Sequence, residues 1–398
     1  MSDVDKQIIY HSVIMGCDPE LFFEQGGKIV GAEKVIDEKG LSSKGQTRVT
    51  RDDYLVNAYG RDKHFVLDGV QIELNPAPHS CRANMGNEIK VAMKALKKHL
   101  SEMRMQGIKA SFRSVVEVDR AELDSLSEKS RILGCQPSNN LYDSHATVSV
   151  DPVTYNKRSA GGHIHIGLTA NPSGYPLDGY SELMKHREML VPLMDVLVGL
   201  PSVMVDRDPL AAERRKVYGR AGEYRLPKHG LEYRTLSNFW LRSYQLMSFV
   251  FGLTRLAVSV LGTEHYRYLY RESYSKAELE KLDAQGWPAA TTLLSTIDID
   301  RVKEAINQNN LELALEQFQH VKSFLLKHVI TGDYGLNGSN VGAFETFCKT
   351  VSDKGLTHYF PQDPLEHWCN MPEGHTGTGW EAFMEAVGRG DAFKTTYV

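Results

Sequence analysis

Residues 161–167 read GGHIHIG, a stretch that places two histidines one residue apart behind a pair of glycines. In an extended strand, alternate side chains point to the same side. His163 and His165 are therefore predicted to share one face of a strand, while Ile164 and Ile166 lie on the opposite, buried face. Such an imidazole pair is typical either of a ligand site or of hydrogen-bonded structural histidines.

Three other short segments show the same division into one apolar and one ionisable face. They are GCDPELFF (16–23), GVQIELNPAP (69–78) and GLEYRTLS (230–237). If the four strands adjoin in one sheet, their carboxylates repel one another unless a cation lies among them. Mg²⁺ or Mn²⁺ is the expected ion, since hard divalent ions take carboxylate oxygens, sometimes with an imidazole. Taken singly, each segment also fits an ordinary solvated strand. The ionisable groups of these three segments are Asp18, Glu20, Glu73, Glu232 and Arg234.

An arginine-rich segment lies just before the last of these strands and runs into it. Residues 213–234 read ERRKVYGRAGEYRLPKHGLEYR. Guanidinium groups bind phosphate or carboxylate oxygens through a planar fork, so the segment is interpreted as an anion site. The alternative is a solvated loop in which Glu213, Glu223 and Glu232 neutralise the arginines. Acidic metal ligands beside arginines are typical of sites for phosphoryl transfer, where metal ions and cationic side chains stabilise charge on the transferred group. Because no P-loop or kinase motif occurs, a nucleotide site would be built on a sheet.

The length, composition and net charge of the chain limit the class of protein. The 398 residues are 41% hydrophobic, enough for one large core with an appended lobe. The net charge of −4 shows no basic excess for nucleic acid. The five cysteines form no C-x-x-C pair and the N-terminus lacks a signal-peptide layout, so a cytoplasmic location is expected. The apolar stretch 239–261 carries Arg242, Gln245 and Arg255, so a buried helix is predicted there and no membrane partner is expected.

Hydrophobic periodicity gives a coarse outline of the elements. Residues 8–80 are predicted to be mainly β, 86–107 and 178–200 to be helices, and 134–160 to be a long loop. Strands and helices do not alternate as βαβ units, so an α+β fold is predicted. Two parts are expected, a core at 8–270 and a helical, loop-rich extension at 271–398 packed on that core.

The chain resembles the glutamine synthetase-like carboxylate–amine ligases, and most closely the phage-associated type 2 COOH–NH2 ligase (amidoligase) family. The resemblance implies a glutamine synthetase-like catalytic core, in which a curved antiparallel sheet flanked by helices carries the active site. A mostly helical C-terminal region would follow. The resemblance spans residues 16–240 and is carried by GCDPELFF, GVQIELNPAP, GCQPSNN, GGHIHIG and ERRKVYGRAGEYRLPKHGLEYRTLSNFW.

The resemblance also implies roles for individual residues. His165 would face phosphate or substrate, and Asn140 lies in a loop similar to the family's G-C-x-P-x-x-N element and is assigned to the cofactor site. Apart from the resemblance, the mechanism needs a general base for the amine proton, and Glu223 is the candidate. Arg220, Arg225 and Arg234 match the arginines that hold the ATP phosphates and the acyl-phosphate. The residues that match metal ligands are Asp18, Glu20, Glu73, His163 and Glu232.

The implied activity is ATP-dependent formation of an amide bond through an acyl-phosphate, with Mg²⁺ or Mn²⁺. The expected partners are a small-molecule or peptide carboxylate and an amine, in the cytoplasm, or in the host cytoplasm if the chain is phage-encoded. The number of subunits stays open, with a homo-oligomer among the alternatives. Two departures argue against glutamate and ammonia as the substrates. The first acid of the pair is Asp18 rather than Glu, and neither a β-grasp domain nor an ammonium-site signature is evident.

Three alternatives stand beside the ligase. A phosphagen-type kinase shares the fold and ends at a phosphorylated product without an amide. A non-catalytic metal- or nucleotide-binding phage-related protein would hold metal without turning over ATP, although a structural metal would not require the arginines. A zinc hydrolase is the third, but H-x-H alone is too little for it and no H-E-x-x-H occurs.

Overall fold

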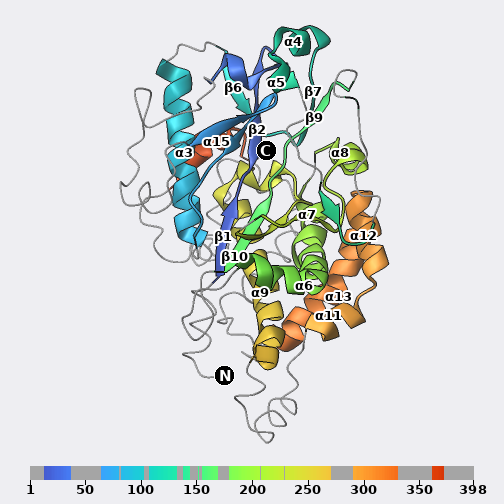
Figure 1. The fold of residues 1–398 in the computed structure, drawn as a ribbon. Coiled ribbons are helices and arrows are strands. Elements are labelled where there is room, and N and C mark those ends of the chain that lie inside the picture. The colour runs from blue at the N-terminus through green and yellow to red at the C-terminus, as the bar shows by residue number, and fades with distance from the viewer. Residues whose placement is uncertain are drawn as a thin grey trace, which may run out of the picture.

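A computed structural model gives the fold, and Figure 1 shows it as a ribbon. Its described part combines curled antiparallel strands with helices, which is the predicted α+β class. The strands form a half-barrel-like surface in which β1 and β10 run side by side, with α3 on one flank and α6 and α7 on the other (Figure 1). The structure describes residues 13–36, 64–79, 82–102, 107–131, 138–143, 151, 155–168, 179–206, 208–227, 229–269, 290–329 and 361–371.

The first sheet of the described residues has the strand order β1-β10-β12-β11-β8, with every neighbour antiparallel. Its register aligns Gly16 and three polar residues in one row across the strands. Gly16 lies opposite His165, His165 opposite Glu232, and Glu232 opposite Arg225. The strands are β1 (Val13–Cys17), β10 (Ile164–Leu168), β12 (Gly230–Tyr233), β11 (Glu223–Arg225) and β8 (Asn139–Asn140).

The second sheet has the order β3-β2-β5-β4, and β6 also pairs with β2. Here the register places Glu20 directly opposite Glu73. The strands are β2 (Glu20–Gln25), β3 (Lys28–Val30), β4 (Phe65–Asp68), β5 (Gln71–Leu74) and β6 (Ile108–Ser111). A short ladder of β7 (Val115–Glu117) and β9 (Lys157–Ser159) completes the described strands.

The two sheets meet at Asp18 and Pro19, between β1 and β2. Pro19 has no N–H to donate to a ladder, while its carbonyl accepts a 2.9 Å bond from Leu74 N. The four polar-faced segments therefore do not all lie in one sheet, because 16–23 divides between two and β5 of 69–78 lies in the second. The predicted loop at 134–160 is also corrected, since it contains β8 and β9, which are too short to show alternation.

Helices cover the apolar side of the strands and begin and end near the predicted positions. The helix predicted at 86–107 is described over 82–102, and the one predicted at 178–200 continues to Val205 through a π-helical turn. The helical elements are η1 (Ala32–Lys34), α3 (Arg82–Glu102), α4 (Arg120–Ser125), α5 (Glu128–Arg131), α6 (Gly179–Met194), η2 (Asp195–Gly199), α7 (Leu200–Val205), α8 (Ala211–Val217), η3 (Asn238–Arg242), α9 (Tyr244–Leu269), α11 (Ala290–Thr296), α12 (Ile299–Asn307), α13 (Leu311–Val329) and α15 (Pro364–Cys369).

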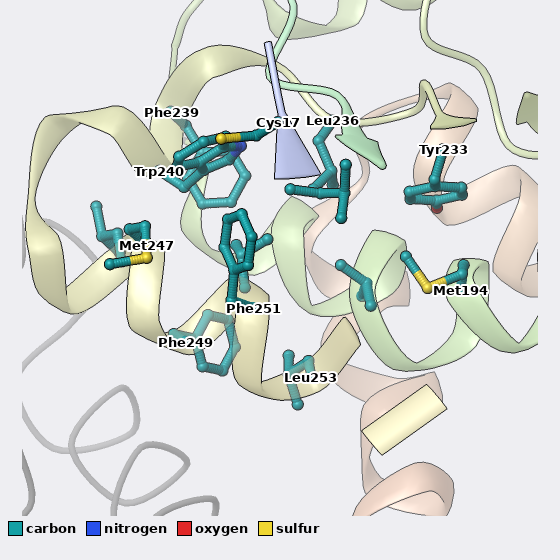
Figure 2. Packing of buried hydrophobic residues seen from close by; sticks show 14 of the residues in the cluster. Cys17, Met194, Tyr233, Leu236, Phe239, Trp240, Met247, Phe249, Phe251 and Leu253 are labelled. Carbon is teal, nitrogen blue, oxygen red and sulfur yellow. The ribbon is translucent and has the colours of Figure 1, made fainter. Parts of the chain in front are cut away.

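One large core lies between the strands and these helices. Ile164 and Ile166 of β10 are fully buried in it, as the alternation predicts. Figure 2 shows Phe239, Trp240 and Phe251 gathered near Cys17, and the Trp240 and Phe251 rings meet edge to face at 5.8 Å. Because this core takes the apolar faces, the polar faces of β10 and β12 turn to the other side.

The long apolar segments are core helices. Arg187–Val205 is long and apolar enough to span a membrane, but 89% of it is buried within the fold. The stretch predicted as one buried helix at 239–261 is a 3₁₀ turn, η3, followed by α9. Toward the C-terminus, α11 and α13 pack on α6, α7 and α9, and α15 packs on α3 and η3. The predicted boundary at 270–271 lies outside the described residues.

Candidate active site

Among the described residues, two groups of side chains converge where the sheets meet. The first group is Asp18, His163 and Glu232, and the second is Glu20, Asp68 and Glu73. In each group, one ligand atom per residue lies within 4.8 Å of the others. Asp18 and Glu20 are separated only by Pro19, so the two groups adjoin. The structure thus brings together the five residues predicted as metal ligands and adds Asp68.

In the first group, two imidazoles face one carboxylate. His163 Nδ1 lies 3.1 Å from Asp18 Oδ1 and 3.4 Å from Glu232 Oε1, and His165 Nε2 lies 3.1 Å from Asp18 Oδ2. Within the described residues, Asp18 Oδ1, His163 Nδ1 and His165 Nε2 are buried but not aligned in any hydrogen bond. Buried polar atoms normally have a partner. A divalent cation would satisfy Asp18 Oδ1 and His163 Nδ1, so this set fits the predicted metal.

The glycine pair before the histidines makes this arrangement sterically feasible. A Cβ on Gly161 would overlap His163 Nε2, and a Cβ on Gly162 would overlap the carbonyl oxygen of Ser237. Trp240 Nε1 also donates a 3.0 Å bond to the carbonyl of Gly162. The two glycines of GGHIHIG therefore leave space for an imidazole and for close backbone packing.

The second group consists of three carboxylates and carries a strong electrostatic conflict. Glu20 and Glu73 are directly opposed on neighbouring strands, where like charges are destabilising. Two ionised carboxylates 4.8 Å apart, the upper limit of the separations within the group, repel each other by about 3.5 kcal/mol at an effective dielectric constant of 20. The three pairs together then cost roughly 10 kcal/mol. The group is therefore stable only if it holds protons or a cation. A purely carboxylate set is the kind that Mg²⁺ or Mn²⁺ prefers.

The pKa directions of the second group follow from burial and mutual repulsion. Burial, reinforced by Asp68 and Asp18, raises the pKa of Glu20 to about 8. Burial and the neighbouring carboxylates, Asp18 foremost, raise the pKa of Glu73 well above its ordinary value. Glu20 Oε2 also accepts bonds from Gly161 N at 2.6 Å and from Gln71 Nε2 at 3.1 Å, which fix the carboxylate in place.

In the first group, the pKa values of the carboxylates are shifted downward rather than upward, because imidazoles lie next to them. Burial disfavours the charge of Asp18, but attraction to His163 and His165 outweighs it and holds the pKa of Asp18 far below its usual range. Burial likewise opposes ionisation of Glu232, yet His163 and a bond from Arg225 keep its pKa below the ordinary value. These two carboxylates are thus ionised at neutral pH.

Two of the three predicted arginines contact Glu232. Arg225 donates from Nε to Glu232 Oε2 at 2.7 Å and from Nη2 to Oε1 at 2.8 Å, a bidentate pair. Arg234 Nε lies 3.1 Å from Glu232 Oε1 and the residue is buried. The side chain of Arg220 is 38% exposed and its Nη1 lies 3.5 Å from Asp143 Oδ2, at the edge of the site.

The first two arginines of the run serve the backbone. Arg214 donates to the carbonyls of Thr235 and Leu236 at 2.9 and 2.8 Å, and Arg215 donates to the carbonyls of Gly219 and Thr235. Both side chains are buried. Burial, with repulsion from Arg214, lowers the pKa of Arg215 to about 10. They hold the segment that follows β12 in place.

Asn140 and Glu223 contact the loop at 219–222. Both oxygens of Glu223 accept 3.0 Å bonds from backbone amides, those of Gly219 and Arg220. Asn140 donates to the carbonyl of Ala221 at 2.9 Å, and its Oδ1 accepts from two backbone amides of its own loop. In this conformation both side chains fix the backbone that presents Arg220.

Sequence reasoning missed Asp68 and Tyr218. Asp68 ends β4 just before Gly69, which has φ +63°, so the D-G step between two apolar strands was the available signal. Tyr218 is buried, and its hydroxyl contacts His163 Nε2. No alternation pattern connects these two residues to His163, because they reach the site from a hairpin and from a loop.

A comparison with known families finds a match that covers part of this site. Residues 147–286 match the family model described as phage phiEco32-like COOH.NH2 ligase-type 2. The matched range contains His163, His165, Glu232 and the arginine run, whereas Asp18 and Glu20 precede it. No curated protein matches the sequence. The match supports the family predicted from the motifs, because residues 147–286 are similar to the phage phiEco32-like COOH.NH2 ligase-type 2 family.

Proposed function

We propose that this protein is an ATP-dependent carboxylate–amine ligase, built on a glutamine synthetase-like core, that forms an amide through an acyl-phosphate. The observation that carries the proposal is the pair of adjoining groups of possible cation ligands at the sheet junction, with Arg225 and Arg234 beside them. The ligase name of the matched family supports the same activity. The substrates are expected to be a small-molecule or peptide acid and an amine, in the cytoplasm.

The proposed cation ligands are the two groups themselves. Asp18, His163 and Glu232 would hold one ion, and Glu20, Asp68 and Glu73 another. Bound Mg²⁺ or Mn²⁺ would offset the charge of the ATP phosphates and help to orient them. The fixed bonds of Gly161 and Gln71 to Glu20 keep that carboxylate in place before any ligand arrives.

The reaction is proposed in two balanced steps. An oxygen of the substrate carboxylate attacks the γ-phosphorus, and ADP leaves. The amine nitrogen then attacks the acyl carbon, phosphate leaves with the transferred oxygen, and the proton lost by the amine passes to the departing phosphate. The arginines contribute by offsetting the charge that develops when a carboxylate approaches ATP.

The structure changes the proposed role of two residues. Both oxygens of Glu223 accept hydrogen bonds from the backbone of the loop at 219–222, here called the arginine loop because it presents Arg220. We therefore assign Glu223 to holding this loop rather than to accepting the amine proton. Asn140 has the same role on the other side of the loop. Arg220, at the half-exposed edge, remains the arginine with most freedom to meet an incoming phosphate.

The activity test is phosphate release from ATP with Mg²⁺ or Mn²⁺ and pools of amino acids and polyamines. We expect release that depends on both an acid and an amine and that is lost in Glu20→Ala and His163→Ala. Glu316→Gln, on the exposed part of α13, is the matched control and should retain activity. A phosphorylated acceptor without an amide would instead favour the kinase alternative, and bound metal without ATP turnover would favour a non-catalytic protein.

A further inference from the structure

Tyr218 lies directly behind His163, on the side of the imidazole away from the carboxylates. Its hydroxyl contacts His163 Nε2, and the two rings meet edge to face at 5.7 Å. The other nitrogen, Nδ1, faces Asp18 and Glu232. Tyr218 follows α8 with an extended backbone, φ −161° and ψ 146°, which carries the chain out of the helix beside the site.

The chemistry of imidazole gives this contact a direction. A neutral imidazole carries one proton, on one of its two nitrogens. When Nδ1 offers its lone pair to a cation, the proton lies on Nε2 and requires an acceptor, which the phenolic oxygen supplies. Such partners of ligand histidines fix the tautomer and the orientation of the ring.

The ring of Tyr218 is itself held by two buried arginines. Arg214 Cζ lies 5.0 Å from the ring centroid and Arg234 Cζ lies 5.1 Å from it, both within cation–π range. Arg214 is anchored on two carbonyls, and Arg234 also contacts Glu232. One tyrosine therefore connects the arginine run to the cation ligands.

We propose that Tyr218 is a positioning residue that holds His163 with Nδ1 toward Asp18 and Glu232, and thereby sets the affinity of this group for a divalent cation. The inference rests on the proposed cation position. The contacts on opposite sides of the imidazole carry it, together with Gly161, where any Cβ would overlap the same Nε2.

Calorimetric titration of Mn²⁺ into the metal-stripped full chain tests the proposal, with Tyr218→Phe compared with the unchanged protein. The substitution keeps the aromatic ring and both arginine contacts and removes only the oxygen. We expect roughly 10- to 100-fold weaker Mn²⁺ binding, the usual loss for such a partner, with little change in the melting temperature of the metal-free chain. Tyr233→Phe is the matched control, since its hydroxyl is also buried but donates to Asp195 at 2.6 Å. The control should bind Mn²⁺ as the unchanged protein does.

The outcomes separate this inference from the function on which it rests. Equal Mn²⁺ affinity in Tyr218→Phe and the unchanged protein overturns the role of Tyr218 alone. Absence of Mn²⁺ binding in the unchanged protein overturns the cation position and this inference together. If Tyr218→Phe does not fold, the ¹⁵N shifts of His163 in the Mg²⁺-loaded unchanged protein decide. A proton on Nε2 supports the proposal, and a proton on Nδ1 contradicts it.

Discussion

Glu20 and Glu73 lie directly opposite each other on β2 and β5, with Asp68 close to both. Cross-strand partners of like charge destabilise a sheet, so this pairing persists at a stability cost unless a cation or protons offset it. Burial raises the pKa of Glu20 to about 8 and that of Glu73 well above its ordinary value, so protons can offset the repulsion in the metal-free protein.

Glu73→Gln tests that conflict, because glutamine resembles the protonated acid but cannot become an anionic ligand. In EDTA the variant should be as stable as the unchanged protein, or more stable by up to about 1 kcal/mol. The rise in melting temperature on adding Mg²⁺ should be strongly reduced. Thermal unfolding with and without Mg²⁺ measures both effects. Glu24→Gln, farther along β2, is the control and should keep the full Mg²⁺ effect. A normal Mg²⁺ effect in Glu73→Gln would remove this residue from the cation group.

A pH prediction follows from Asp195, which lies in η2 and accepts a 2.6 Å bond from Tyr233. Burial raises the pKa of Asp195 from 3.8 to about 6, against the opposing effect of the Tyr233 bond. Because the folded protein holds this proton more tightly than the unfolded chain, its contribution to stability is fully present below about pH 4. That contribution is lost as the pH rises through about 6.

The difference in unfolding free energy between the unchanged protein and Asp195→Asn should therefore depend on pH. From pH 4 to pH 7 the unchanged protein should lose roughly 3 kcal/mol relative to the variant, since each pKa unit corresponds to about 1.4 kcal/mol. Urea unfolding at several pH values measures it. A difference that is constant across this range would show that Asp195 does not hold a proton in the folded state.

Gly161→Ala should disrupt the histidine site by steric means. The added Cβ overlaps His163 Nε2, and the ring has to move. Overpacking of this kind costs about 1–3 kcal/mol, and Mn²⁺ affinity should fall with it. Gly16→Ala, in the neighbouring strand β1, is the control, because its Cβ would meet His165 Cβ at an ordinary 3.5 Å. Titration calorimetry and thermal unfolding of both variants check this, and similar behaviour of the two would count against the steric explanation.

Asn307 at the end of α12 connects the C-terminal helices to the arginine loop. Its Oδ1 accepts a 2.8 Å bond from the amide of Ala221. Asn307→Ala leaves this partly buried amide without its acceptor, which costs about 1–3 kcal/mol. Hydrogen exchange at Ala221 should become faster, while exchange in β10 stays unchanged. Gln308→Ala, on the exposed neighbour, should leave Ala221 protected, and unaltered exchange in Asn307→Ala would disprove the connection.

Much of the site was predictable because short strands show their two faces in sequence. The isoleucines of β10, Ile72 of β5 and Val70 just before β5 are buried as the alternation indicates. The carboxylates predicted from the same pattern do meet. Their division between two sheets was not predictable, because alternation shows the faces of a strand but not which strands pair.

Other features depend on contacts between distant segments. Whether Glu223 faces a substrate or its own loop is decided by the turn at 219–222, where Gly219 and Gly222 have φ of +75° and +80°. Asp68 enters the site only through the register of its hairpin, and Tyr218 only through the end of α8. Neither position carries a periodic signal that local sequence analysis detects.

The most direct measurement of the proposed ligase chemistry follows one oxygen atom. The protein would be incubated with ATP, Mg²⁺, an amine pool and amino acids whose carboxylates carry ¹⁸O, and the released phosphate examined by mass spectrometry. Reaction through an acyl-phosphate transfers one ¹⁸O atom to phosphate for each amide formed, and His163→Ala should abolish both products. Phosphate without ¹⁸O, released at the same rate whether or not the amine is present, would contradict the ligase.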